Sequence, residues 1–119
     1  MSAAIGQHLL ADLHGVVPAL LSDATRVESA LREAARAAGA TVLFGHVHPF
    51  GDGLGVTGVL LLMESHISIH TWPEHGFAAV DVFMCGDARP ELALASLAAS
   101  FTPARCIRRL VPRGQPPSP

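Results

Sequence analysis

Five residues in one short stretch have side chains that could do chemistry together: Glu64, Ser65, His66, His70 and Glu74. Serine is a nucleophile once its proton is removed, and imidazoles and carboxylates can move that proton. Apolar runs flank the stretch, which predicts strands on both sides of it, at 59–63 and 77–80. An unsatisfied polar group buried there would cost roughly 1–3 kcal/mol, so we expect these groups to serve a site.

Side chains alternate along a strand, and this places the polar residues of the stretch together. His66, Ser68 and His70 project to one face, and the two isoleucines between them project to the other. The alternation therefore predicts a continuous polar strip that begins beside Ser65.

The stretch also resembles a known family. Glu-Ser-His at 64–66, His-Thr-Trp-Pro-Glu at 70–74 and Cys85-Gly86 together resemble the self-cleavage signature of the small bacterial S-adenosylmethionine decarboxylases, which are pyruvoyl enzymes. The resemblance covers about residues 5–111 and is strongest over 55–86. It implies a proenzyme that cuts itself between Glu64 and Ser65 into chains 1–64 and 65–119.

The chemistry that the resemblance implies begins at Ser65. If this residue lies in a strained turn, its hydroxyl can attack the Glu64 carbonyl and convert the amide into an ester. Elimination then cuts the chain, and hydrolysis with loss of ammonia leaves a pyruvoyl group in place of Ser65. That ketone condenses with an amine to an imine, which is an electron sink for decarboxylation.

The resemblance also implies roles for other residues. His70 and Thr57 would assist processing, and Cys85 would return a proton to the substrate carbon. Phe50 would stack on the adenine of the substrate, and Glu74 would supply an acid. Three departures from the family pattern bear on the substrate: threonine at 57 in place of serine, histidine at 75 in place of tyrosine, and a 50–57 loop about one residue longer.

Composition narrows the classes of function. The formal charge is -2 and there is no basic run, which argues against nucleic acid and anionic membranes as partners. No signal segment or long apolar run is visible, so we expect a cytoplasmic protein. Cys85 and Cys106 form no metal-type pair, and no metal is expected. The chain has no lysine, so pyridoxal phosphate would lack its Schiff-base amine.

The predicted fold is a two-layer α/β (α+β) sandwich with a mainly antiparallel sheet and two helices on one face. The expected helices begin with a capping box at Thr25–Glu28 and with Pro90, and the second presents Leu92, Leu94 and Leu97. A single domain should span 1–111, and the proline-rich tail 112–119 should be disordered. Strands are expected at 7–14, 41–50, 56–63, 67–72, 77–84 and 106–111.

The second face of such a sheet would need cover, which predicts a homodimer or a higher oligomer. S-adenosylmethionine is the preferred substrate, and its decarboxylated product would serve spermidine synthesis. Ornithine or arginine, used by the same pyruvoyl machinery, stays open as an alternative. A different class also stays open: a regulatory dimer, or a zinc-binding dimer with ligands from His46, His48, His66 and His70, in which the chain stays uncut.

Overall fold

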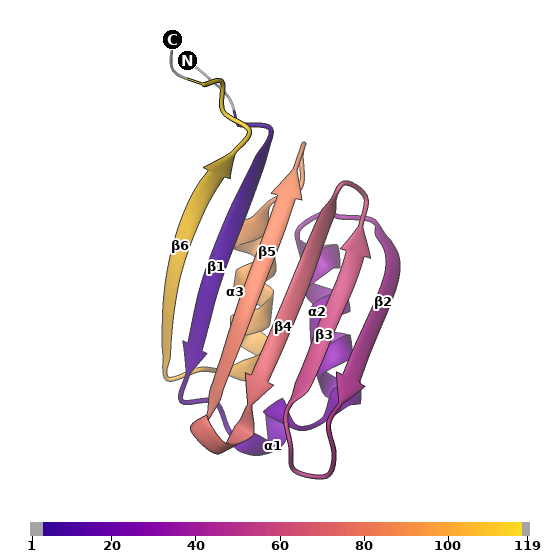
Figure 1. Cartoon of the computed structure of the whole chain (residues 1–119), viewed down its shortest axis with the longest axis vertical. Coiled ribbons are helices and arrows are strands. Elements are labelled where there is room, and N and C mark those ends of the chain that lie inside the picture. The colour runs from indigo at the N-terminus through magenta and orange to yellow at the C-terminus, as the bar shows by residue number, and fades with distance from the viewer. Residues whose placement is uncertain (1–3, 118–119) are drawn as a thin grey trace.

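The computed structural model describes residues 4–117, which form one six-stranded antiparallel sheet covered by helices (Figure 1). The strand order is β2-β3-β4-β5-β1-β6. The strands are β1 (Gly6–His14), β2 (Val42–Pro49), β3 (Val56–Leu62), β4 (Ser65–Trp72), β5 (Phe77–Cys85) and β6 (Arg105–Arg113). The predicted two-layer fold is confirmed.

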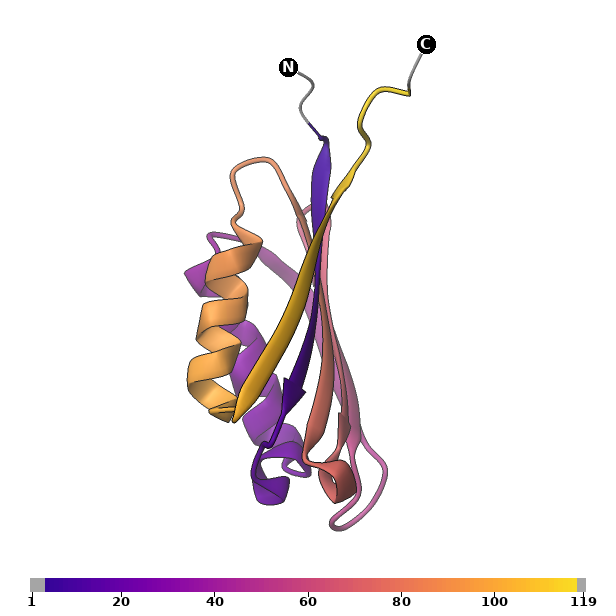
Figure 2. The same cartoon turned by 90° about the vertical axis from the view of Figure 1, so that its left-hand side faces the viewer.

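The two long helices lie on one side of the sheet, as Figure 2 shows in profile. They are α2 (Ala24–Ala37) and α3 (Pro90–Phe101). The short α1 (Pro18–Leu21) precedes α2, and the single-turn η1 (Pro73–His75) connects β4 to β5. The two short helices were not predicted, because four or fewer residues leave no periodic signal. Within the described residues, no helix is both long enough and apolar enough to span a membrane.

The start of α2 differs from the prediction. Asp23, and not Thr25, is the N-cap: its carboxylate accepts a hydrogen bond from the Arg26 backbone N–H at 3.1 Å. A carboxylate in this position satisfies an orphan backbone donor, so it outcompetes the capping box two residues later. The end of the helix is as expected, with Gly39 in the left-handed conformation at φ 79°.

The hydrophobic core lies between the helices and one face of the sheet. Alternate residues of every central strand point into it, and α2 and α3 each contribute one apolar side. Leu94 and Leu97 belong to this core, whereas Leu92, the third apolar position named from the sequence, is 38% exposed. The largest fully buried side chains include Leu13, Leu31, Leu60, Ile67, Ile69, Leu97 and Phe101.

The opposite side of the sheet, which we call the open face, has no helix over it among residues 4–117. It is formed by the strand residues that alternate with the core positions, among them Leu10, Phe44, Leu61, Ser68, Trp72, Asp81 and Phe83. Several of these apolar side chains are more than a third exposed. A single chain therefore leaves this face uncovered, as the sequence predicts.

The C-terminal strand is longer than predicted. β6 continues to Arg113 along β1, so Pro112 and Arg113 belong to the sheet and not to a disordered tail. Proline is tolerated because β6 is an edge strand, where one backbone side has no ladder partner. The final two residues of the predicted tail, 118–119, lie outside the described residues.

One buried hydroxyl ties the helix layer to the sheet, and its removal is the first test. Thr71, 6% exposed, donates to the Leu21 carbonyl at 2.7 Å and accepts from the Val56 N–H at 2.9 Å. We expect Thr71→Val to lower the free energy of unfolding by about 1–3 kcal/mol, because the shape is kept while two buried backbone groups lose their partner. Urea denaturation at one fixed protein concentration measures this.

The matched control is Thr41→Val, at an exposed position. It should change the free energy of unfolding by less than about 0.5 kcal/mol. Equal effects of the two substitutions would contradict the role assigned to the Thr71 hydroxyl.

Candidate functional site

Ser65 begins β4 directly after a strained residue. The β3–β4 hairpin pairs Leu62 with Ser65 and turns through Met63 and Glu64. Glu64 has φ 54°, the left-handed region, which costs a residue with a Cβ roughly 1–2 kcal/mol. The peptide bond between Glu64 and Ser65 therefore follows a strained residue in a tight connection.

The thiol of Cys85 lies against this peptide bond. Cys85 ends β5, the neighbour of β4, and its S–H donates to the Glu64 carbonyl oxygen with an S···O distance of 2.9 Å. The Cys85 sulfur is also 4.0 Å from the Ser65 hydroxyl oxygen. The structure thus brings together three predicted site residues, which we call the junction group: Glu64, Ser65 and Cys85.

A second set of predicted residues gathers at the other end of the same strands. Phe50, Thr57, His70 and Glu74 line a pocket of about 230 Å³, and we call them the pocket group. The Thr57 hydroxyl and the His70 Nδ1 share a hydrogen bond at 3.1 Å, because β3–β4 register places the two residues opposite each other. A hydroxyl at 57 can thus orient the imidazole, as serine would.

The two groups do not meet within one chain. His70 follows Ser65 by five residues on the same strand, which amounts to roughly 16 Å at the usual rise of about 3.3 Å per residue. One His70 side chain cannot reach the Ser65 hydroxyl of its own chain. The polar strip is real, since the isoleucines at 67 and 69 are fully buried, but it separates the predicted residues instead of collecting them.

Sequence reasoning missed two parts of this region. Trp72 lines the pocket of the pocket group and stacks on Phe77 with ring centroids 5.3 Å apart. Its position two residues after His70 on the open face was the signal that could have found it. The stacked ring of His66 on Phe83, 5.8 Å between centroids, likewise follows from the pairing of β4 with β5.

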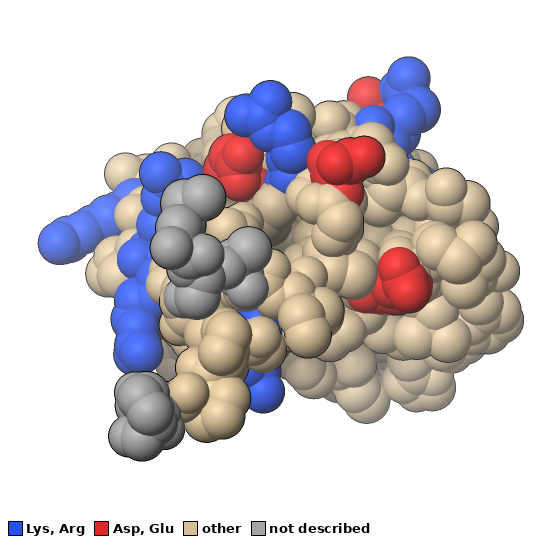
Figure 3. Space-filling model, turned by 90° about the horizontal axis from the view of Figure 1, so that it is seen from above, with Lys and Arg blue, Asp and Glu red and all other residues tan. Residues whose placement is uncertain are grey.

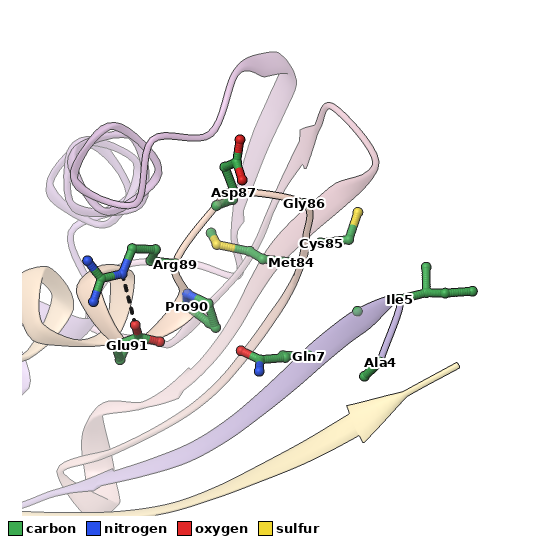
Figure 4. Close-up of a pocket in the computed structure, with 12 residues that line it drawn as sticks. Ala4, Ile5, Gln7, Met84, Cys85, Gly86, Asp87, Arg89, Pro90 and Glu91 are labelled. Atoms are coloured by element: carbon green, nitrogen blue, oxygen red, sulfur yellow. Dashed lines mark hydrogen bonds and ion pairs between the residues drawn. The ribbon is translucent and has the colours of Figure 1, made fainter. Parts of the chain in front are cut away.

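A third missed feature is a pocket of about 410 Å³ beside the junction group (Figure 4). Gln7, Cys85, Asp87 and Glu91 are among its lining residues, and Figure 4 shows the Met84 and Cys85 side chains on opposite sides of β5. The backbone N–H of Glu91 lowers the pKa of its own carboxyl, and Arg89 at 3.2 Å adds to this. Glu91 is therefore anionic at neutral pH.

The histidines considered as zinc ligands are not gathered. His46 and His48 lie on β2, His66 and His70 lie on β4, and β3 runs between them. Among the described residues, no group of three or more histidine, cysteine, aspartate or glutamate side chains is placed to hold a metal ion.

Comparisons with known proteins agree with one another. A family model described as S-adenosylmethionine decarboxylase matches residues 7–114. A protein of Thermodesulfovibrio yellowstonii named S-adenosylmethionine decarboxylase proenzyme is 44% identical over 99 residues, 82% of this chain and 73% of its own length. One of the same name from Sulfurihydrogenibium is 41% identical over 118 residues, 98% of this chain and 88% of its own.

A solved structure has the same fold. The crystal structure of the adenosylmethionine decarboxylase from Aquifex aeolicus superposes with a TM-score of 0.88 at 38% identity, covering 94% of this chain and 92% of that one. The resemblance indicated by the central motif is confirmed: this chain belongs to the S-adenosylmethionine decarboxylase family.

Proposed function

We propose that this chain is a proenzyme that cuts itself between Glu64 and Ser65 and then decarboxylates S-adenosylmethionine with a pyruvoyl group made from Ser65. The observation that carries the proposal is the junction group: a strained residue, a scissile carbonyl that accepts a hydrogen bond from a thiol at 2.9 Å, and a hydroxyl next to both. The names of the relatives, which include the word proenzyme, support it.

The first step transfers an acyl group. The Ser65 oxygen bonds to the Glu64 carbonyl carbon, the hydroxyl proton leaves, and the Ser65 nitrogen departs with a proton, which turns the amide into an ester. The Cys85 S–H points at the oxygen on which negative charge develops, and donors so placed stabilise an oxyanion. Relief of the left-handed Glu64 conformation favours the same direction.

The second step breaks the chain. A base removes the α-proton of residue 65, the bond from its Cβ to the ester oxygen breaks, and Glu64 leaves as a carboxylate. Water then adds at the carbon that carries the nitrogen, the nitrogen leaves as ammonia, and a ketone remains at the start of chain 65–119. When present, that ketone supplies the electron sink for the pair released as carbon dioxide departs. Cys85 adjoins this position and can return a proton to the substrate carbon.

The 16 Å separation supports a two-copy site. If two copies stack by their open faces about a two-fold axis perpendicular to the strands, the junction group of one lies over the pocket group of the other. The axis would pass near Ser68, midway between Ser65 and His70 on β4. His70 and Thr57 of the partner subunit would then serve the proton transfers at Ser65.

The pocket group suits the proposed substrate. Phe50 is 58% exposed and Trp72 38%, so each ring keeps exposed surface that can stack on a base or contact a sulfonium cation. Glu74, on the same pocket, adds a carboxylate for a hydroxyl or a positive charge. An aromatic wall of this kind fits S-adenosylmethionine better than ornithine or arginine, which carry no ring.

Ser65→Ala should abolish cleavage and activity together, because alanine has no nucleophile and yields no ketone. Intact mass under denaturing, reducing conditions should give two fragments for the unaltered chain and one for the variant. Assays of carbon dioxide release should find activity with S-adenosylmethionine and little with ornithine or arginine. Ser68→Ala, on the same strand, is the control that should still be cut; an uncut parent chain at neutral pH would overturn the proposal.

Cys85→Ala should slow cleavage and lower kcat in the cleaved fraction by about 100-fold or more, since it removes both the carbonyl donor and the proton donor. Cleavage is followed by mass, and turnover is normalised to the amount of pyruvoyl chain. Cys106→Ala, at an exposed position on β6, is the matched control and should be unaffected. Unchanged turnover in Cys85→Ala would remove the residue from the reaction.

His70→Ala should slow cleavage by about 100-fold when expressed alone. Co-expression with Ser65→Ala should restore cutting of the His70→Ala chain, because the Ser65→Ala partner still supplies an intact His70. Differently tagged chains let mass spectrometry follow each one. If the Ser65→Ala chain fails to restore cutting of the His70→Ala chain at every ratio of the two chains, both groups act within a single copy.

A further inference from the structure

Six of the seven histidines share one side of the molecule. Strand register places these six on the open face, whereas the seventh, His75, lies in η1. They come from one edge strand and two inner strands of the sheet: His46 and His48 on the edge strand β2, His66 and His70 on β4, and His8 and His14 on β1. Each alternates with a core position of its strand, as the buried pattern of these strands requires.

Few other charged groups lie on this face. Asp12 and Asp81 are its carboxylates, from β1 and β5. Arg105, Arg109 and Arg113 share the parity of the open face on β6, while β2, β3 and β4 add no charged side chain besides the histidines. Seen from the end of the sheet in Figure 3, Asp, Glu and Arg side chains lie mainly toward the helix layer and along one side. At neutral pH the face is therefore close to balanced.

We infer that the histidines of the open face make the face-to-face assembly of two copies acid-sensitive, so that the dimer separates as the pH falls below the range in which imidazoles are neutral. This inference rests on the proposed two-copy site, which commits the open face to a second copy of this chain.

The dimer should separate in acid because protonated imidazoles oppose the stacking of two copies. An imidazole takes up a proton near pH 6.5. Two stacked copies would bring together up to twelve such cations in a setting partly closed to water, where charge is penalised by desolvation and by like-charge repulsion. The neutral form thus favours assembly, so assembly releases protons. Dimer stability is fully present above the usual imidazole range and is lost as the pH falls through it.

His8 works in the opposite direction. Its Nε2 lies 3.4 Å from Oδ1 of Asp81, and the other carboxylate oxygen of Asp81, Oδ2, accepts a hydrogen bond from Ser68 at 3.5 Å. The same nitrogen is buried and has no hydrogen-bond partner within the described chain. Asp81 places a negative charge beside this ring, so this one contact opposes the acid effect.

The other five histidines lack such a partner. Within the described residues, His8 is the one histidine with a carboxylate oxygen within 4 Å. Four of the rest lie beside aromatic rings: His14 by Phe77, His48 by Phe50, His66 by Phe83 and His70 by Trp72, with centroid distances of 5.0–6.3 Å. His46 has His48 as its ring neighbour at 6.2 Å. Five histidines per copy therefore oppose assembly in acid and one favours it, so the net effect of acid is to weaken the dimer.

Sedimentation measurements of the full chain between about pH 8 and 5.5 test the inference. The Ser65→Ala precursor and the processed protein are run in parallel, so that assembly is read independently of cleavage. We expect the dimer dissociation constant to rise at least about tenfold from pH 7.5 to 5.5, the change due if one imidazole per dimer must stay neutral. Far-UV circular dichroism should find the separated monomers still folded.

The discriminating variants replace histidines outside the proposed machinery. His14→Gln together with His46→Gln should flatten the pH dependence, whereas His75→Gln, the histidine off the open face, should leave it unchanged. For the unaltered chain, calorimetry in buffers of different ionisation enthalpy should detect proton release on assembly at about pH 6.5, which keeps the test valid if the double variant does not fold.

Each outcome decides between the two proposals. A dimer whose dissociation constant is flat with pH, or no proton release on assembly, overturns the acid sensitivity and leaves the proposed function standing. Acid unfolding of parent and double variant at the same pH overturns it as well. A chain that is monomeric at all pH values yet cuts itself overturns the two-copy site.

Discussion

The antiparallel register of β3, β4 and β5 is the constraint on which the site depends. It sets Cys85 against Glu64 at one end of the strands and Thr57 against His70 at the other. A slip of one residue would turn every side chain of β4 to the opposite face and expose Ile67 and Ile69, both fully buried. The cost of exposing two isoleucines, roughly 3–6 kcal/mol, holds the register in place.

The single helix layer follows from this arrangement and creates the need for a partner. α2 and α3 cover one face of the sheet, and the apolar core fills the space between them. The other face mixes exposed apolar side chains with histidines. Water solvates the apolar side chains poorly, and an apolar helix layer would leave the histidines without polar partners. The groups proposed to do chemistry all border that face, so in the proposed dimer the same surface would serve assembly and reaction.

The sequence predicts the strands, the two long helices and the alternation at 66–70, because these depend on local periodicity. It does not predict the Cys85–Glu64 contact, since pairing of β4 with β5 is a long-range event. The separation of His70 from Ser65 is different: five residues at a strand's rise give the distance directly. A family motif groups residues by role and conceals that geometry. The Asp23 cap was missed because a second capping candidate, Thr25, stands two residues later. The extension of β6 was missed because its pairing with β1 is a tertiary contact.

In the proposed arrangement, each copy holds strain and nucleophile at one end and the proton-moving imidazole at the other. A lone chain then has a strained Glu64–Ser65 bond without its base, and is protected from premature cleavage until a partner arrives. The split also explains how a chain of 119 residues can enclose a substrate with an adenine ring. One copy offers a pocket of about 230 Å³ on an open surface, and stacking two copies by their open faces would close it.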